Sequence, residues 1–538
     1  MRLALIAIYA LAIFTSCSSP KEPKHSQTIV KLNICDEPNT LDPRKARDLN
    51  SMSVARMLFD GLTRIGKQEK AELALASSVT ISSDVKKYTF HLRECKWSNG
   101  DPVTARDFVH AWKKVLDPKF PADAAFQLYV IKNAKAVKEG KVSLDELGVR
   151  IVNDKTLEVE LEYAVPYFLE LVALPIFFPV HETTDQKNSQ WADSPATFVS
   201  NGPFQLAEWK HHDVITVKKN PLYWDAASVQ LTVIELTMVS DDAELKMYEK
   251  KELDWAGSPL STLPVEAIHA FKNDKSFKTK ELLGTYFIRV NTEHGPLQHP
   301  SIRKALALAI NRQAIVDHVT QGNQIPACGL VPLSFGLQQA PYFQDGAVEE
   351  AKKLFTQALS DLHMTREKFP QFTLIYSSNE RNHLIAQALE QQWFQALGIR
   401  VKLEGIERSV YFDRMSKLDY QLASSSWVAD FNDPINFLEV FKYKRSGSNN
   451  TQWENARYAE LLSQSSMVIH ANERLNLLKM SEQLLIEEMP ILPIFYYTML
   501  YLQDPQLHDV VLSSMGSVDF KWAYKGGNHS QVIVQGEK

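Results

Sequence analysis

The sequence predicts a mixed α/β protein with more than one lobe, and three observations support this class. Its length of 538 residues exceeds the roughly 100–200 residues of a typical domain. Several short segments alternate apolar and polar residues, as half-buried strands do. Residues 372–403 follow a strand, helix, strand order, which is typical of a β-α-β unit with parallel strands.

The N-terminal half contains most of the alternating segments. Strands are expected from Ile29 onward and at 88–92, 156–161 and 214–217. A helix is expected over residues 51–62, capped by Asn50 or Ser51. Thr104 is expected to cap a second helix that ends before Pro118.

The β-α-β unit is expected to begin with a strand at 372–376. The following helix, from about Arg381 to Leu397, should turn Leu384, Ala388 and Leu389 inward and stop at Gly398. The next strand carries Ile399, Val401 and Leu403 in alternation. Short strands return from Leu492 to the C-terminus.

The composition excludes some classes of protein. The 59 basic and 64 acidic residues give a net charge of −5, so the chain is not a generally basic protein built to hold nucleic acid. Four cysteines in this length cannot form a disulfide scaffold. Apart from Cys17, they are Cys35, Cys95 and Cys328, for which burial as small hydrophobic residues is expected and at most one disulfide is possible.

The N-terminus carries the pattern of an export signal. Arg2 precedes an apolar run over residues 3–14, which is too short to span a bilayer, and two small residues lead into Cys17. This arrangement resembles the processing site of bacterial lipoproteins, which implies a signal peptide at 1–16, acylation of Cys17 and a polar tether at 17–27. The alternative is an ordinary secretory peptide. The protein is expected outside the cell or in the periplasm, attached to a membrane by a lipid anchor. The sequence does not specify which membrane carries the anchor.

No catalytic motif emerges from the sequence. Phosphate-binding loops, dinucleotide fingerprints and the nucleophile elbow are absent, and residues 181–185 lack the second histidine of a zinc protease motif. His211 and His212 flank Asp213, but neighbouring residues of a strand face opposite sides, so these are interpreted as exposed loop histidines rather than a chelating pair. We expect no enzyme, no metal and no cofactor.

Seven short segments stand out along the chain. They are 37–43 (EPNTLDP), 88–93 (YTFHLR), 97–112 (WSNGDPVTARDFVHAW), 201–204 (NGPF), 220–224 (NPLYW), 301–311 (SIRKALALAIN) and 427–434 (WVADFNDP). Together and in this order they resemble the bacterial extracellular solute-binding proteins of the peptide and nickel transport family (family 5), especially its oligopeptide-binding members. The resemblance covers residues 28 to about 525, and the shared order of the segments makes a chance match improbable.

The resemblance implies a large type II periplasmic-binding-protein-like fold, in which two lobes close on a ligand by hinge motion. Lobe I would combine residues 28–50, 198–283 and 498–538. Residues 51–197 would form an additional domain packed on it, and residues 284–497 would form lobe II, which contains the β-α-β unit.

The resemblance also implies a ligand site. Asp430 matches the aspartate that pairs with the α-amino group of a bound peptide, while Trp427 and Ala429 would line the same pocket. Glu37 and Tyr497 match other cleft-lining positions. A turn acid capping residues 432–434 is the alternative for Asp430.

The basic residues that receive the ligand carboxylate in peptide-binding members are missing. Met415, Ser424 and Thr320 occupy or lie near those positions, and Asn382 replaces a histidine, although Arg381 and His383 flank it. Gly284 and Val428 stand where some relatives have a disulfide. The sequence therefore does not indicate how the C-terminal carboxylate of a bound peptide is held. A ligand longer than the pocket, an unusual peptide such as a cell-wall fragment, or other basic residues would each explain the pattern.

The resulting expectation is a monomeric lipoprotein that delivers oligopeptides to the permease subunits of an ABC importer. The same fold could instead bind a nickel chelate, heme or a saccharide. An exported hydrolase and a purely adhesive surface protein are the alternatives from other classes.

Overall fold

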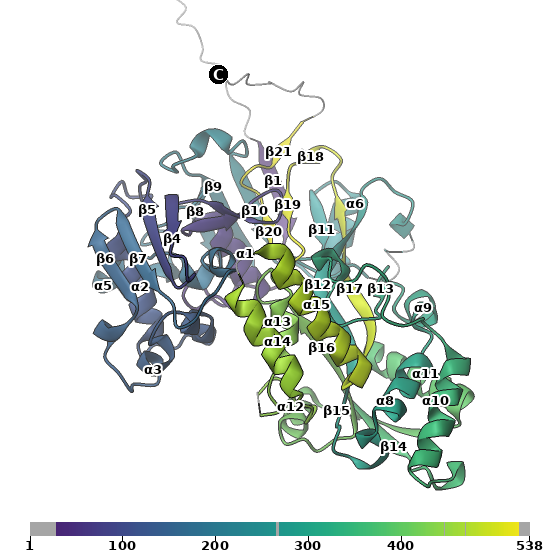
Figure 1. Cartoon of the computed structure of the whole chain (residues 1–538). Coiled ribbons are helices and arrows are strands. Elements are labelled where there is room, and N and C mark those ends of the chain that lie inside the picture. The colour runs from purple at the N-terminus through teal and green to yellow at the C-terminus, as the bar shows by residue number, and fades with distance from the viewer. Residues whose placement is uncertain (1–27, 265–267, 269, 446, 469, 527–538) are drawn as a thin grey trace, which may run out of the picture.

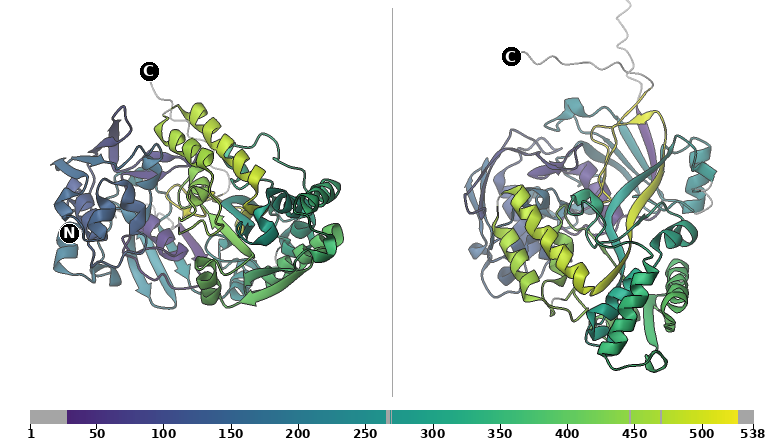
Figure 2. Two further views of the ribbon diagram at one scale, coloured as in Figure 1. Left: turned by 60° about the horizontal axis from the view of Figure 1, so that its bottom comes forward. Right: turned by 45° about the vertical axis from the view of Figure 1, so that its right-hand side comes forward.

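The computed structural model describes residues 28–264, 268, 270–445, 447–468 and 470–526. The chain is mixed α/β, and Figure 1 shows strand-rich N-terminal segments at one end and helices of the residue 300–420 region at the other. Figure 2 gives the same separation from two further directions. The predicted signal peptide, Cys17 and the predicted tether lie outside the described residues.

A four-stranded sheet contains the first described strand. Its order is β1 (Ile29–Asn33), β10 (Val233–Thr237), β9 (Val214–Lys219) and β8 (Phe204–Lys210), and β1 lies parallel to β10 while the other pairs are antiparallel. Val30 and Leu32 of β1 are buried, as the alternation predicts. The sheet therefore joins residues 29–33 to residues 204–237.

Residues 51–197 contain an antiparallel sheet of their own, ordered β4 (Ala76–Ile81), β5 (Lys87–Leu92), β7 (Thr156–Glu160) and β6 (Val149–Asn153). Helix α2 (Ala105–Leu116) begins with a capping box in which the Thr104 amide donates to Asp107 Oδ2 at 2.8 Å. The predicted cap of α1 was wrong. The helix spans Leu49–Leu58 and is capped by Asp48, which accepts from the Ser51 amide and so begins the helix earlier than expected.

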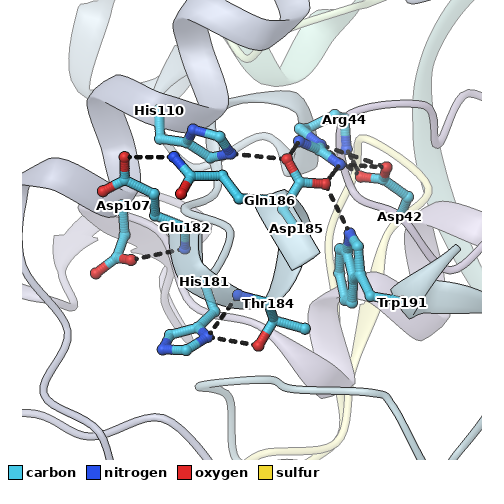
Figure 3. Close-up of polar contacts among 10 residues, drawn as sticks. All are labelled: Asp42, Arg44, Asp107, His110, His181, Glu182, Thr184, Asp185, Gln186 and Trp191. Atoms are coloured by element: carbon cyan, nitrogen blue, oxygen red, sulfur yellow. Dashed lines mark hydrogen bonds and ion pairs between the residues drawn. The ribbon is translucent and has the colours of Figure 1, made fainter. Parts of the chain in front are cut away.

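An ion network ties the loop after β1 to residues 105–191 (Figure 3). Arg44 donates to Asp42 and, at 2.8 and 2.7 Å, to both carboxylate oxygens of Asp185. His110 of α2 lies 2.7 Å from Asp185, and the Trp191 indole also donates to it. Asp185 belongs to α5 (Glu182–Lys187), and the His181 side chain caps the N-terminus of this helix by accepting from the Thr184 amide.

A second, seven-stranded sheet contains the β-α-β unit. Its order is β11 (Trp255–Gly257), β17 (Ile491–Gln503), β12 (Phe277–Val290), β16 (Leu422–Val428), β14 (Phe372–Ser377) and β15 (Val401–Ile406), with β13 (Ile325–Pro326) also paired to β17. Strands β14 and β15 are parallel and are joined by α11 (Glu380–Leu397), as predicted.

Helix α11 departs from its prediction on one point. Its buried residues include Ile385, Leu389 and Trp393, whereas Leu384 is 42% exposed and Ala388 only half-buried. The predicted apolar face was rotated by one residue toward the N-terminus. Gly398 ends the helix at φ 68°, a left-handed conformation that glycine adopts without strain.

The pairing of β12 with β17 changes partway along both strands. Residues 277–281 pair with 498–502, and residues 285–289 pair with 491–496, with a register shift between Glu281 and Thr285. The predicted lobe boundaries at 283/284 and 497/498 fall at this irregularity, inside two continuous strands.

The other helices and short strands complete the two ends and the region between them. They are β2 (Thr63–Ile65), β3 (Ala71–Leu73), α3 (Ala134–Lys138), α4 (Phe168–Leu171), α6 (Asp241–Glu249), α8 (Pro300–Leu308), α9 (Arg312–Ile315), α10 (Val348–Asp361), α12 (Arg408–Ser416), α13 (Ile435–Leu438), α14 (Ala456–Met467), α15 (Ala471–Glu488), β18 (Leu507–His508), β19 (Val511–Leu512), β20 (Val518–Asp519) and β21 (Tyr524–Lys525).

The three cysteines within the described ranges are free thiols. Cys95 and Cys328 are buried, as expected for small hydrophobic residues. Cys35 is only half-buried, and its thiol lies 3.1 Å from Asp241. Across the described residues, no helix combines the length and apolar character that a membrane crossing requires.

Candidate functional site

Asp430 lies just beyond the C-terminal end of β16. The pairing of β16 with β12 extends one residue further, because the Ala429 amide donates to the Leu283 carbonyl at 2.8 Å. Ala429 is buried. The chain then leaves the sheet. The carboxylate of Asp430 is thus carried at the rim of the sheet, where a ligand can reach it.

Asn436, on the short helix α13, organises the residues around Asp430. Its side-chain oxygen accepts from the Asp430 amide at 3.1 Å and from the Trp427 indole at 2.9 Å. Asn436 is itself buried. One amide therefore fixes both the turn at Asp430 and the orientation of Trp427.

The residues after Asp430 are held against other parts of the chain. Phe431 stacks on Tyr167 with ring centroids 4.4 Å apart, and Asn432 donates to the Glu69 carbonyl. Asp433 forms a two-fold ion pair with Arg474 of α15, with both contacts at 2.8 Å. These contacts restrict the backbone around Asp430, so its carboxylate has a defined place.

Asp430 lines a pocket of about 300 Å³ between β16 and the N-terminal segments. Arg47 and Arg56 line the same pocket. Most of the other walls are apolar or small, from Ala46, Leu49, Met52, Ala124, Phe126, Leu174, Pro175, Ile176, Val428, Ala429, Met515 and Gly516. The lining brings together residues from both ends of the sequence.

The Asp430 carboxylate has no cation at ion-pair distance within the described part of the chain. Burial raises its pKa above the ordinary value, while a side-chain hydrogen bond with Asn436 and the positive charge of Arg47 oppose the rise. A half-buried carboxylate in this state gains most from a cationic group that enters the pocket.

The outer half of β16 has an open edge beside this pocket. Strand β14 pairs with β16 only at Leu422 and Ala423, whereas β12 pairs with it as far as Val428. Among the described residues, 424–428 thus have a strand partner on one side only, and the Tyr411 hydroxyl donates to the Ser424 carbonyl. An extended peptide can pair with such an edge through its backbone.

Tyr497 lies near the same strand but faces a second pocket of about 430 Å³. Tyr286, Arg381 and Asn382 also line it. Burial raises the pKa of Tyr497, and a side-chain hydrogen bond with Ser426 and the charge of Arg381 act in the opposite direction. The sequence prediction therefore places Tyr497 on a pocket, though not on the one that holds Asp430.

The residues at the expected basic positions are structural. Met415 is buried beside Tyr411, Ser424 is buried within β16, and Thr320 donates to the Gln324 side chain at 2.7 Å. Asn382 donates to the Ser377 carbonyl, while the His383 ring lies 2.6 Å from the Tyr376 hydroxyl.

Gly284 and Val428 are direct partners across β12 and β16. A Cβ atom built on Gly284 would lie 3.0 Å from side-chain atoms of both Val428 and Tyr497. This close packing next to Asp430 explains why the smallest residue fits at position 284.

Glu37 is held by other residues of the chain. One carboxylate oxygen accepts from the Trp209 indole at 2.8 Å and lies 2.6 Å from His211 Nδ1, and the other lies 2.9 Å from His212 Nδ1. Both histidines are exposed, as predicted. The expectation that they face apart was wrong, because they lie in a turn in which His212 adopts φ 58°.

No group of three or more His, Cys, Asp or Glu side chains in the described ranges is arranged to hold a metal ion. The histidine, acid and arginine network around Asp185 is fully engaged in its own contacts. Its role is structural.

Sequence reasoning missed Asn436, Arg47 and Arg56. Asn436 follows closely on the recognised 427–434 segment, so an amide on the next helical turn was the available signal. Arg47 and Arg56 lie almost 400 residues away from Asp430 and only the fold brings them to its pocket.

Comparison with known proteins agrees with this architecture. Residues 70–449 match the model of the bacterial extracellular solute-binding proteins, family 5. The chain is 42% identical over 511 residues to the oligopeptide-binding protein OppA of Bacillus subtilis, covering 94% of each chain.

Two solved structures give the fold in different states. The unliganded open form of the murein tripeptide binding protein MppA is 29% identical, covers 93% of this chain and 97% of its own, and has a TM-score of 0.84. Haemophilus influenzae OppA in complex with RPPGFSPFR is 28% identical, covers 93% and 99%, and has a TM-score of 0.72. The two-lobed periplasmic-binding-protein fold is therefore shared over almost the whole chain. The chain belongs to family 5 of the bacterial extracellular solute-binding proteins, which are binding proteins and not enzymes.

Proposed function

We propose that this protein captures oligopeptides between its lobes and delivers them to the permease subunits of an ABC importer, with the peptide α-amino group paired to Asp430. The observation that carries the proposal is the Asp430 carboxylate, which is half-buried, rigidly held and without a cationic partner in the described chain. An ammonium group would supply the missing charge. The peptide-bound relative supports peptides as the solute class.

The open edge of β16 supports the mode of binding. A peptide added along residues 425–428 would form backbone hydrogen bonds that do not depend on its side chains. Water in the adjoining pockets would accommodate varied side chains. The same edge leads directly to Asp430, which would fix the register of the peptide.

Ligand capture involves closure of the two lobes about β12 and β17. The register shift near residues 281–285 is a natural place for bending, because pairing is interrupted there in both strands. The higher TM-score with an open form than with a peptide complex, at nearly equal identity, supports an open ligand-free conformation. We assign lobe I to residues 28–50, 198–283 and 498–538, the additional domain to 51–197 and lobe II to 284–497.

A lipid anchor at the N-terminus attaches the protein to a membrane, with the folded chain facing the periplasm or the cell exterior. Cleavage after Ser16 and acylation of Cys17 would leave a short tether before β1 begins at Ile29. Mass spectrometry of the mature N-terminus should show a lipid-modified Cys17. Cys17→Ser should move the protein from the membrane fraction to the soluble fraction, and an unmodified N-terminus would contradict the anchor.

Identification of the bound solute tests the proposed function. Native mass spectrometry of gently purified protein should show complexes whose released ligands are peptides with free N-termini. Small-angle scattering should show a smaller radius of gyration after peptide is added to the ligand-free protein. Release of a saccharide, heme or metal chelate, with no response to peptides, would contradict the proposal.

A further inference from the structure

The pocket that holds Asp430 contains two guanidinium groups and one carboxylate among its lining side chains. Arg47 and Arg56 line the pocket from the N-terminal segments, and Asp430 lines it from just beyond the end of β16. A ligand ammonium that paired with Asp430 would leave the two guanidinium groups without a carboxylate partner among the lining residues. The charge balance of the pocket therefore calls for a second, anionic group on the ligand.

Neither arginine is fully used by the protein. Arg47 makes one contact of 3.4 Å with Asp123, and both side chains of this pair are mostly exposed, so the contact is weak. Arg56 donates to the Met52 carbonyl at 3.5 Å, and no described carboxylate lies at ion-pair distance from it. Asp519, the nearest acid by its electrostatic effect, is already bound to Arg64 at 2.6 Å.

Burial makes the charge on Arg56 costly in the empty pocket. It lowers the pKa of the guanidinium to about 10, and the charge of Arg64 adds to this effect while that of Asp519 opposes it. A carboxylate brought in by the ligand would face a half-buried cation that lacks a carboxylate partner within the described chain, a setting in which ion pairs are stronger than at an open surface.

The shape of the pocket limits where this anionic group can be. The first side chain of a peptide begins one bond from the carbon that carries the ammonium group, so it enters the same pocket. Leu49, Phe126 and Ile176 offer apolar walls for its methylene groups. Resting on the proposed pairing of the peptide ammonium with Asp430, we infer that Arg47 and Arg56 form a specificity site that selects peptides with an acidic first residue.

The test compares pentapeptides Xaa-Ala-Ala-Ala-Ala, with Xaa as Glu, Gln or Lys, by isothermal titration calorimetry on the full chain stripped of ligand. Wild type should bind the Glu peptide about tenfold more tightly than the Gln peptide, and the Lys peptide most weakly. Arg47→Gln and Arg56→Gln should each reduce the ratio of Glu to Gln affinity to below threefold. Because Arg47 is exposed, its variant is expected to fold even if that of Arg56 does not.

Lys45→Gln is the matched control, since it removes a positive charge two residues from Arg47 on an exposed side chain that does not line the pocket. It should keep the wild-type ratio. Equal binding of the Glu and Gln peptides to wild type would overturn the inference and leave peptide capture intact, as would an unchanged ratio in Arg47→Gln. Failure of all three peptides to bind would instead contradict the proposed function on which the inference rests.

Discussion

Asp185 and Asp430 are both carboxylates that are at least partly buried, but they differ in their partners. Asp185 has cationic partners in the protein, and Asp430 has none at ion-pair distance among the described residues. Asp185 accepts hydrogen bonds from Arg44, His110 and Trp191, so both of its carboxylate oxygens have partners within the protein (Figure 3). Burial alone would raise its pKa, but the hydrogen bonds and charges of His110 and Arg44 outweigh burial and hold the pKa well below its ordinary range. The pKa of Asp430 is raised instead.

The difference separates a structural charge, Asp185, from the charge at Asp430 that we propose binds the ligand. The network around Asp185 joins the loop at 42–44 to α2 and α5, and each partner is internal. The Asp430 carboxylate faces a pocket, with amide contacts from Asn436 that position it without neutralising it. A charge that lacks an internal partner is the better guide to a ligand site.

Asp185→Asn should cause the largest loss of stability. It removes one of the two carboxylates that compensate the buried Arg44, the other being Asp42, and breaking a buried ion pair costs about 3–5 kcal/mol. Urea unfolding at pH 7 measures the effect. Asp123→Asn removes an exposed partner of Arg47 and should change stability by less than about 0.5 kcal/mol.

The pH dependence of the Asp185 contribution has a defined sign. The pKa of Asp185 is depressed in the folded protein, so its stabilisation is present above the ordinary pKa of an aspartate and is lost as the pH falls through the lower folded value. Wild type and Asp185→Asn should thus converge in acid. A constant difference from pH 7 into strong acid would contradict the network.

Glu482 is an intermediate case and should give a smaller, opposite pH effect. It is buried and accepts from the amides of Leu330 and Val331 and from the Tyr342 hydroxyl, and burial raises its pKa to about 7. The contribution of Glu482 to the free energy of unfolding should fall by roughly 3 kcal/mol as the pH rises from 4.5 to 7. Glu482→Gln should lack this component, as unfolding measured across that range will show; an equal slope in both proteins would refute it.

Asp430→Asn should change the stability of the ligand-free protein far less than Asp185→Asn. The substitution removes a charge that is shielded without a cationic partner, so the free energy of unfolding should stay within about 1 kcal/mol of wild type or rise slightly. Thermal unfolding without ligand tests this. A loss comparable to that of Asp185→Asn would mean that Asp430 is a structural charge.

Much of the fold could be predicted because the signals are local. Alternation located β1, β5, β7 and β9, and the strand, helix, strand order located the parallel pair of β14 and β15. The errors at α1 and α11 concern one turn or less. They arose because capping depends on which nearby side chain reaches the free amides, and burial depends on what packs against the helix.

The candidate site could be predicted only in part. Asp430 and Trp427 lie in one recognisable segment, and both donate a hydrogen bond to the side-chain oxygen of Asn436. Glu37 contacts Trp209, which is far from it in the sequence. Arg47 and Arg56 line the same pocket as Asp430, although they are also far from it in the sequence. No local pattern contains that information.

The most direct measurement is a cycle of two proteins and two peptides by isothermal titration calorimetry. Wild type and Asp430→Asn are each titrated with one pentapeptide carrying either a free or an acetylated N-terminus. If Asp430 pairs with the ammonium group, acetylation should weaken binding to wild type by about 30-fold or more and weaken binding to Asp430→Asn by less than threefold. Equal losses on acetylation in both proteins would contradict the pairing.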